Sequence, residues 1–465
     1  MRYVSTRGLA PTLDFEGVLL AGLATDGGLY IPDRFPELSP EALRALRGRS
    51  YADIVAAVCW PYVEGSLPRD VFDACVQRAY AGFAHAAVAP LKQVAANDWL
   101  LELFHGPTLA FKDFALQLLG LLFAEVLARR GETITIVGAT SGDTGSAAIR
   151  AVAGRERMRI AILHPLGRVS EVQRRQMTTV PDANVHNIAI QGTFDDCQDL
   201  VKALFNDLAF RDEARLAAVN SINWARIMAQ IAYYVSAAVS LGSPDRPVAF
   251  SVPTGNFGDV YAGYAAHRMG LPVARLVVAT NRNDILARFL ATGRYAAGEV
   301  HPTISPSMDI QVASNFERLV HDLLDGDPAA VRAWMAGFAR DRSAAVAPAA
   351  LERARGLFAG HRTDESTTRD VIADTLRRTG ELIDPHTAVG LAGAAACRPE
   401  AAVPMVTLAT AHPAKFPDAV EAAAGVRPAL PPHMAGLFDL PERCVTLAND
   451  LDALRAHIRQ KVLSP

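Results

Sequence analysis

One lysine of this chain lies where its amine could take part in covalent chemistry. Lys112 follows the Gly-Pro pair at 106–107 and stands between Phe111 and Phe114 at the start of a strongly apolar run. The long side chain of such a lysine usually extends its amine to water. Alternatively, burial lowers the pKa of the amine, and a neutral amine can form a Schiff base. Composition leaves both possibilities open.

Two glycine-rich turns each lie between a predicted strand and a predicted helix. The first is GATSGDTG at 138–145 and the second is PTGNFGD at 253–259. The backbone N–H groups of such a turn can converge on one point, and the N-terminus of the following helix favours an anion there. Glycines also let the backbone approach a phosphate closely. Either turn could equally be an ordinary connection, and neither matches the P-loop or GxGxxG pattern.

The elements that must position these groups alternate between short apolar runs and amphipathic segments. The runs predict strands at 133–139, 159–164, 185–191, 247–252, 274–279 and 404–409. The segments predict helices at 146–152, 170–178, 195–206 and 259–269 and from about 416, and the stretch 114–128 predicts a buried helix. This alternation predicts an α/β fold with open, mostly parallel sheets flanked by helices. Ligands bind beyond the carboxyl ends of such strands, where both turns fall.

Composition and charge exclude several classes of protein. The chain has 465 residues, half of them hydrophobic, and 46 Lys+Arg against 49 Asp+Glu give a net charge of −3. That balance predicts no surface for nucleic acid or for an anionic membrane. The N-terminus lacks the pattern of a signal peptide, and no stretch reaches 18 apolar residues. We therefore expect a cytoplasmic protein that binds neither nucleic acid nor membrane.

Disulfides and metal sites are not expected either. The five cysteines are far apart and form no CxxC pair, which suits a reducing compartment. No HxxH, HxH or clustered carboxylate pattern supports a metal site. His105, His412 and Lys415 lie near possible site motifs, but local structural roles account for them at least as well.

Several motifs in one order carry a family resemblance. GPTxxFKD at 106–113, TSGDTG at 140–145 and PTGNFGD at 253–259 resemble the tryptophan-synthase-β-like class of pyridoxal-phosphate enzymes, which has fold type II. Within that class the chain is similar to the threonine synthases of the longer bacterial and fungal type. Further matching segments are DGGLYIP at 26–32, NSINWAR at 220–226, SMDI at 307–310, SNFER at 314–318 and TAHPAKF at 410–416.

The resemblance implies a site for pyridoxal 5′-phosphate. Lys112 would hold the cofactor covalently and later move protons. Thr410 would hydrogen-bond the pyridine nitrogen, and a neutral hydroxyl there leaves that nitrogen largely unprotonated. Asp259 would close the phosphate-binding loop or open the helix after it. Four residues would bind the cofactor phosphate through main-chain N–H groups: Gly255, Asn256, Phe257 and Gly258.

Other positions would face the cofactor ring and the substrate. Many relatives in the wider class have Asn where this chain has Asp143, opposite the 3′-oxygen of the ring. An anionic carboxylate would repel a phenolate-like oxygen unless the two share a proton. Arg226 could pair with a substrate phosphate or be a solvated residue of a helix that Asn223 caps. The candidates for the substrate carboxylate and phosphate are Ser141, Thr144, Asn220, Ser221 and Arg226.

The resemblance also implies a domain organisation. Residues 1–90 would form a mainly helical N-terminal region, and 91–430 the catalytic core. Within the core, about 132–215 would form a smaller, mobile lobe. Residues 431–465 would form a C-terminal extension that packs on the core. We expect a monomer or a homodimer.

The implied reaction converts O-phospho-L-homoserine and water to L-threonine and phosphate, by γ-elimination and then β-addition of water. A serine or threonine dehydratase or a β-replacement enzyme is one alternative, but an unphosphorylated substrate does not need an anion pocket at 220–226. A non-catalytic threonine-synthase-like protein is another, against which Lys112, the glycine-rich loop and Thr410 argue.

Overall fold

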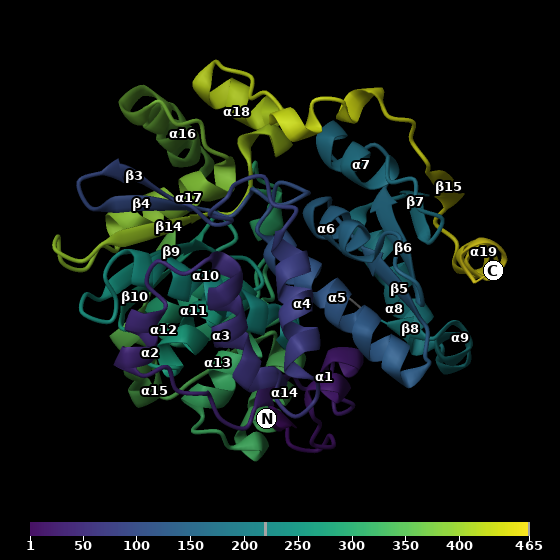
Figure 1. The fold of residues 1–465 in the computed structure, drawn as a ribbon, viewed down its shortest axis with the longest axis horizontal. Helices are drawn as coiled ribbons and strands as arrows, with labels where there is room; N and C mark the ends of the chain where they lie inside the picture. The colour runs from purple at the N-terminus through teal and green to yellow at the C-terminus, as the bar shows by residue number, and fades with distance from the viewer. Residues whose placement is uncertain (218–220, 464–465) are drawn as a thin grey trace.

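The larger of two sheets forms the centre of the molecule. The computed structural model describes residues 1–217 and 221–463. Its six-stranded sheet lies on the left of Figure 1, and all neighbouring strands are parallel except for the β3–β4 hairpin at one edge. The strands, in spatial order, are β13 (Phe358–Arg362), β10 (Val273–Thr280), β9 (Val248–Pro253), β14 (Met405–Ala409), β4 (Asp98–Glu102) and β3 (Leu91–Ala95).

The smaller sheet lies on the right of Figure 1 and is parallel throughout. One edge strand, β15, comes from the C-terminal extension, so the chain returns to this lobe after it completes the larger one. The strands, in spatial order, are β15 (Val445–Ala448), β7 (Val185–Gln191), β6 (Met158–Pro165), β5 (Ile134–Ala139) and β8 (Leu216–Ala217). The predicted class, with two open and mostly parallel sheets, is confirmed.

Helices cover both faces of the large sheet. In α17 (Pro385–Ala396) Gly393 lies against the side chains of Ser251 and Ala279, and in α11 (Gly258–Arg268) Gly263 lies against Leu276. Successive side chains of a strand point to opposite faces, so α17 and α11 pack on opposite sides. A strand that is buried on both faces is predominantly apolar, as β9 and β14 are apart from the buried hydroxyls of Ser251 and Thr407.

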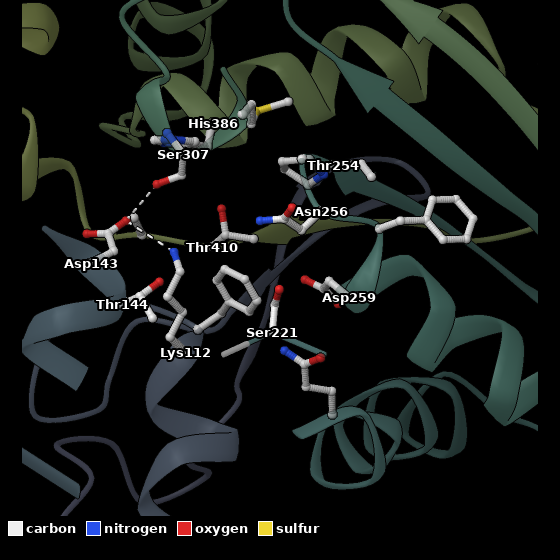
Figure 2. Close-up of a pocket in the computed structure, with 18 of the residues that line it drawn as sticks. Lys112, Asp143, Thr144, Ser221, Thr254, Asn256, Asp259, Ser307, His386 and Thr410 are labelled. Carbon is white, nitrogen blue, oxygen red and sulfur yellow. Dashed lines mark hydrogen bonds and ion pairs between the residues drawn. The ribbon is translucent and has the colours of Figure 1, made fainter. Parts of the chain in front are cut away.

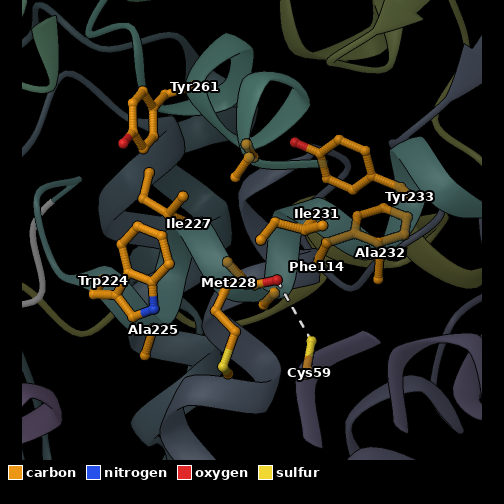
Figure 3. Packing of buried hydrophobic residues seen from close by; sticks show 14 of the residues in the cluster. Cys59, Phe114, Trp224, Ala225, Ile227, Met228, Ile231, Ala232, Tyr233 and Tyr261 are labelled. Carbon is orange, nitrogen blue, oxygen red and sulfur yellow. Dashed lines mark hydrogen bonds between the residues drawn. The ribbon is translucent and has the colours of Figure 1, made fainter. Parts of the chain in front are cut away.

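The N-terminal region shares its core with the large lobe. Figure 3 shows Trp224, Met228 and Ile231 of α10 (Trp224–Ser240) packed with Phe114, and the thiol of Cys59 donates to the Met228 carbonyl at 3.4 Å. The region is mainly helical, with an antiparallel pair of three-residue strands that are too short to show in the hydrophobic pattern. Its elements are β1 (Tyr3–Ser5), α1 (Phe15–Ala21), β2 (Tyr30–Pro32), α2 (Pro40–Ala45), α3 (Tyr51–Val63) and α4 (Arg69–Tyr80).

The remaining elements complete the two lobes. The long helix α5 (Lys112–Arg130) begins beside the site, and the small lobe adds α6 (Asp143–Val152), α7 (Glu171–Thr178), α8 (Phe194–Asn206) and α9 (Leu208–Ala214). The large lobe adds α12 (Ile285–Thr292), β11 (Arg294–Ala296), η1 (Pro306–Met308), α13 (Phe316–Leu323), α14 (Pro328–Asp341), β12 (Ser343–Ala345), α15 (Pro348–Leu357) and α16 (Glu365–Thr379). The last segment holds η2 (Pro413–Lys415), α18 (Pro417–Ala424), η3 (Pro432–Met434), η4 (Leu437–Asp439), α19 (Leu451–His457) and η5 (Ile458–Val462). In the part of the chain that the structure describes, no helix has the length and apolar character to cross a bilayer.

Candidate active site

A cavity opens at the carboxyl ends of β9 and β14, where the small lobe meets the large one. Strand β9 leads into the turn at 253–259, β14 ends just before Thr410, and β5 leads into the turn at 138–145. Most of the predicted site residues line this cavity, and Figure 2 labels many of them. They are Lys112, Asp143, Thr144, Ser221, Arg226, Gly255, Asn256, Phe257, Gly258, Asp259 and Thr410.

Two predicted substrate residues are not among this set. Ser141 is exposed on the turn before α6, and its side chain does not line the cavity. Asn220 lies outside the described residues. The helix begins earlier than the sequence predicted, at Asp143, so Asp143 and Thr144 belong to its first turn.

Lys112 is the first residue of α5, and its side chain is buried, with 9% of the residue exposed. Its Nζ lies 3.4 Å from Oδ2 of Asp143 and 4.8 Å from the centre of the Phe111 ring. Burial lowers the pKa of Lys112, and the positive charges of Lys415 and Arg226 add to this effect, whereas Asp143 opposes it. Of the two environments that the sequence left open, the lysine has the desolvated one.

The turn after β9 presents free backbone N–H groups to the cavity. Among the described residues, none accepts a hydrogen bond from the N–H groups of 255–258. A Cβ at Gly255 would lie 2.7 Å from the carbonyl oxygen of Ser307, so only glycine fits there. Phe257 has a φ of +66°, and its ring packs edge-on against Phe316. Free N–H groups at the start of α11 fit a phosphate group.

Thr410 directly follows β14 and is hydrogen-bonded to the residue that precedes α5. Its carbonyl accepts a hydrogen bond from the N–H of Phe111 at 2.8 Å, which places the threonine beside Lys112. The residue is buried, and Figure 2 shows its side chain in the cavity between Lys112 and Asn256. The site therefore has a neutral hydroxyl, and not a carboxylate, at this position.

Asp143 lies at the centre of a hydrogen-bond network between the lobes. Its Oδ1 accepts from Nε2 of Gln173 at 2.9 Å and lies 3.0 Å from Nζ of Lys415. Its Oδ2 accepts from Oγ of Ser307 at 3.1 Å and faces Lys112. Burial by itself would raise the pKa of Asp143, but Lys415 and Lys112 outweigh burial and hold the pKa well below its usual range. Asp143 is thus an ionised carboxylate between two lysines.

Arg226 is buried in the first turn of α10, with 4% of the residue exposed. Asn223 caps this helix through Oδ1, which accepts from the N–H of Ala225 at 3.0 Å. The cap is as the sequence suggested, but the alternative of a solvated arginine is wrong. Within the described chain, Nε and Nη1 of Arg226 have no hydrogen-bond partner. Burial lowers the pKa of this guanidinium to about 10. An unpaired buried guanidinium calls for an anion.

Asp259 lies in the first turn of α11 and faces two tyrosines. Its Oδ1 accepts from the hydroxyls of Tyr233 at 2.5 Å and Tyr234 at 2.8 Å, and its Oδ2 has no partner in the described chain. Burial raises the pKa of Asp259 to about 6, although the tyrosines act in the opposite direction.

The structure also brings to the cavity residues that the sequence did not single out. His386 donates from Nδ1 to Asp384 at 2.6 Å, and its Nε2 accepts from the N–H of Ser307 at 3.3 Å. The only signal in the sequence was an Asp-Pro-His triplet that caps α17, because a single histidine carries no spacing pattern. Ser307 and Met308 belong to the matching segment at 307–310; both line the cavity, and Met308 is buried. The described residues contain no cluster of three or more potential metal ligands.

Comparisons with known proteins agree with this geometry. Residues 2–80 match the family model of the threonine synthase N terminus, 89–363 that of pyridoxal-phosphate dependent enzymes and 387–458 that of the threonine synthase C-terminal part. The chain is 55% identical over 461 residues to a threonine synthase of Pseudomonas aeruginosa, covering 99% of this chain and 98% of that one. The chain belongs to the threonine synthase family.

Solved structures give the same result. A pyridoxal-phosphate-bound threonine synthase from Brucella melitensis is 52% identical, with a TM-score of 0.98 over 100% of both chains. The yeast threonine synthase is 38% identical, with a TM-score of 0.94 over 99% of this chain and 98% of that one. The expected family, fold type and cofactor are confirmed, and the protein is a pyridoxal-phosphate-dependent enzyme.

Proposed function

We propose that this enzyme converts O-phospho-L-homoserine and water to L-threonine and phosphate. The observation that carries the proposal is the buried Arg226, which has two nitrogens without a partner among the described residues, in a cavity with a second anion site at 255–258. A buried charge without a partner is costly, by several kcal/mol in typical proteins. Two anion sites in one cavity match a phosphorylated cofactor together with a phosphorylated substrate.

Three features of the cavity fit pyridoxal phosphate. Lys112 would hold it through Nζ, the N–H groups of 255–258 would bind its phosphate, and the Thr410 hydroxyl would bind its pyridine nitrogen. When bound, the cofactor supplies a conjugated ring that stabilises negative charge at the substrate Cα and Cβ.

The residues of the chain would then have the following roles in the reaction. Lys112 would take the proton from Cα through Nζ, and its lowered pKa favours the neutral amine that this step needs. Loss of a second proton, from Cβ, would accompany cleavage of the bond between Cγ and the phosphate oxygen while Arg226 holds the leaving phosphate. Cγ would then gain a proton, and water would add its oxygen to Cβ beside the anion that Arg226 retains. Thr144 and Ser221 line the cavity and orient the substrate carboxylate with their hydroxyls.

We propose that the smaller lobe, about 132–215 together with β15, closes over the substrate. Closure would exclude water during elimination and admit it for the addition. The lobe meets the large lobe at the cavity, where the first turn of α6 contributes Asp143 and Thr144. We also propose a cytoplasmic location, which the absence of disulfides among the five described cysteines supports.

Exchanging Arg226 for glutamine tests the proposed substrate. A charge-assisted hydrogen bond contributes about 1.5–3 kcal/mol, so the KM for phosphohomoserine should rise about 10- to 150-fold in Arg226→Gln. Phosphate release measures this reaction. Arg275→Gln is the matched control, because Nε of Arg275 is also buried without a partner in the described chain but does not line the cavity.

The same assay separates the alternatives. A dehydratase would release ketoacid from threonine at a rate that Arg226→Gln leaves unchanged, and it would release no phosphate from phosphohomoserine. A non-catalytic protein would bind the cofactor and turn over neither compound. Either result would contradict the proposed function.

A further inference from the structure

Lys415 is a second lysine at the site, and it has no exposed surface. It lies in η2, just after Thr410, and reaches from the large lobe to the small one. Its Nζ donates to the Thr108 carbonyl at 2.6 Å and to Oε1 of Gln176 at 2.8 Å, and it lies 3.0 Å from Oδ1 of Asp143. An ammonium group has three N–H donors, and all three have a buried acceptor here. This is the geometry of a charged and fully satisfied lysine.

The amine of Lys112 has a different environment, although it shares the same carboxylate. Asp143 turns Oδ1 to Lys415 and Gln173, and turns Oδ2 to Lys112 and Ser307. The Lys415 pair is the shorter of the two, at 3.0 Å against 3.4 Å for Lys112. Asp143 is therefore neutralised mainly by Lys415.

We propose that Lys415 is a positioning residue that balances the charge of Asp143, so that Asp143 does not hold Lys112 as an ammonium ion. The inference deepens the proposed function, because it rests on Lys112 as the lysine that holds the cofactor. Attachment joins Nζ to the aldehyde carbon of pyridoxal phosphate with loss of one water, and it requires the lysine in its neutral form.

The charges around the two groups support this inference. Besides the two lysines, His386 faces Asp143. Burial lowers the pKa of Lys112, Lys415 and Arg226 lower it further, and Asp143 raises it. Without Lys415, Asp143 would be a carboxylate with Lys112 as its nearest cation, and the pKa of Lys112 would rise.

Two more carboxyl groups lie near these lysines, and neither replaces Asp143 as the partner of Lys415. Asp113 accepts from the N–H and the hydroxyl of Thr108, both at 2.7 Å. Asp259 accepts from the tyrosines 233 and 234. Burial raises the pKa of both carboxyl groups to about 6.

The pH dependence of cofactor attachment tests the proposal without an activity assay. Apoprotein is mixed with pyridoxal phosphate at a series of pH values, and attachment is followed by visible absorption and by the mass of the borohydride-reduced peptide. In Lys415→Met the midpoint pH of attachment should rise by about one unit or more. At pH values below the midpoint, each unit of that rise lowers the attachment rate about tenfold. Lys202→Met is the matched control, because Lys202 is exposed and pairs with Asp199.

A double variant separates charge balance from a purely structural role. In Asp143→Asn with Lys415→Met both charges are gone, so the midpoint should return towards that of the wild type. Asp143→Asn alone should lower the midpoint. If Lys415→Met fails to unfold cooperatively, the double variant decides by itself.

Two results would overturn the proposal. One is a folded Lys415→Met variant whose midpoint pH is unchanged, and the other is a double variant whose midpoint pH is shifted as far as that of Lys415→Met alone. Failure of the proposed function would look different: phosphate release from phosphohomoserine would be absent, whatever the midpoints of the Lys415 variants. If another lysine held the cofactor, Lys112→Ala would still give a reduced adduct elsewhere in the chain.

Discussion

The two glycine-rich turns are alike in sequence and in local structure, yet they carry opposite electrostatics. Each follows a parallel strand and opens a helix with an aspartate in its first turn: Asp143 after 138–142 and Asp259 after 253–258. Both aspartates are buried. Lysines hold the pKa of Asp143 well below its usual range, whereas burial raises that of Asp259 to about 6 against the opposing effect of two tyrosines. The partners that decide the charge come from distant parts of the chain.

The turns also differ in which atoms they offer to the cavity. The turn at 253–259 offers backbone N–H groups, and Gly255 fits tightly under the Ser307 carbonyl. The turn at 138–145 offers side chains, those of Asp143 and Thr144. A strand-to-helix turn can therefore bind through its backbone or through its side chains, and local sequence does not separate the two cases.

A glycine-to-alanine substitution in each of the two turns should have the largest difference in effect. Gly255→Ala places a Cβ 2.7 Å from a backbone oxygen, whereas a Cβ at Gly138 would lie 3.5 Å from Cδ1 of Ile162, an ordinary contact. Overpacking costs about 1–3 kcal/mol, and displacing the N–H groups should weaken pyridoxal phosphate binding about 100-fold in Gly255→Ala, at about 1.4 kcal/mol per tenfold. Gly138→Ala should bind it nearly as the wild type does. Cofactor titration and urea unfolding measure both effects, and equal losses in the two variants would refute the distinction.

The two aspartates should give opposite dependences of stability on pH. The pKa of Asp259 is raised from 3.8 to about 6, so its contribution is present below pH 4 and is lost as the pH rises to 6. That loss is about 2–3 kcal/mol at most, and Asp259→Asn should remove it. The pKa of Asp143 is lowered, so its contribution is present above about pH 4 and is lost below.

Urea unfolding of the wild type and of each variant between pH 3 and 7 measures these contributions. Taking the difference between the wild type and a variant cancels groups such as Asp113 that titrate in the same range. The free energy of unfolding of the wild type minus that of Asp259→Asn should fall as the pH rises from 4 to 6. The free energy of unfolding of the wild type minus that of Asp143→Asn should fall only as the pH is lowered. A flat difference for either pair would contradict the assigned charge state.

The smallest expected effect distinguishes two hydroxyl side chains of the glycine-rich turn at 138–145. Thr144 lines the cavity and Ser141 is exposed outside it. Losing one hydrogen bond of about 0.5–1.5 kcal/mol should raise the KM for phosphohomoserine up to about tenfold in Thr144→Val. In Ser141→Ala we expect less than about a twofold change, within the energy of a surface substitution. An effect of Ser141→Ala as large as that of Thr144→Val would mean that lobe closure carries Ser141 into the cavity.

Local pattern was enough for much of the fold. The strand predicted at 185–191 is β7, and the helices predicted at 170–178 and 195–206 differ from α7 and α8 by one residue at the N-terminal end. Strands buried on both faces are continuous apolar runs, which a sequence displays directly. The β3–β4 hairpin was missed because both strands are partly exposed and β3 lies at the edge of the sheet. Strand β15, which has no central apolar run, joins its sheet only through the long return of the chain.

The sequence by itself determined the family, many of the core strands and helices, and the residues with reactive or glycine character, because these are properties of neighbouring positions. Only the tertiary structure decided that Lys112 is buried, that two nitrogens of Arg226 have no partner in the described chain and that Lys415 pairs with Asp143. Burial and ion pairing depend on distances between residues as far apart as 143 and 415. Those distances exist only once both sheets have formed and packed against each other.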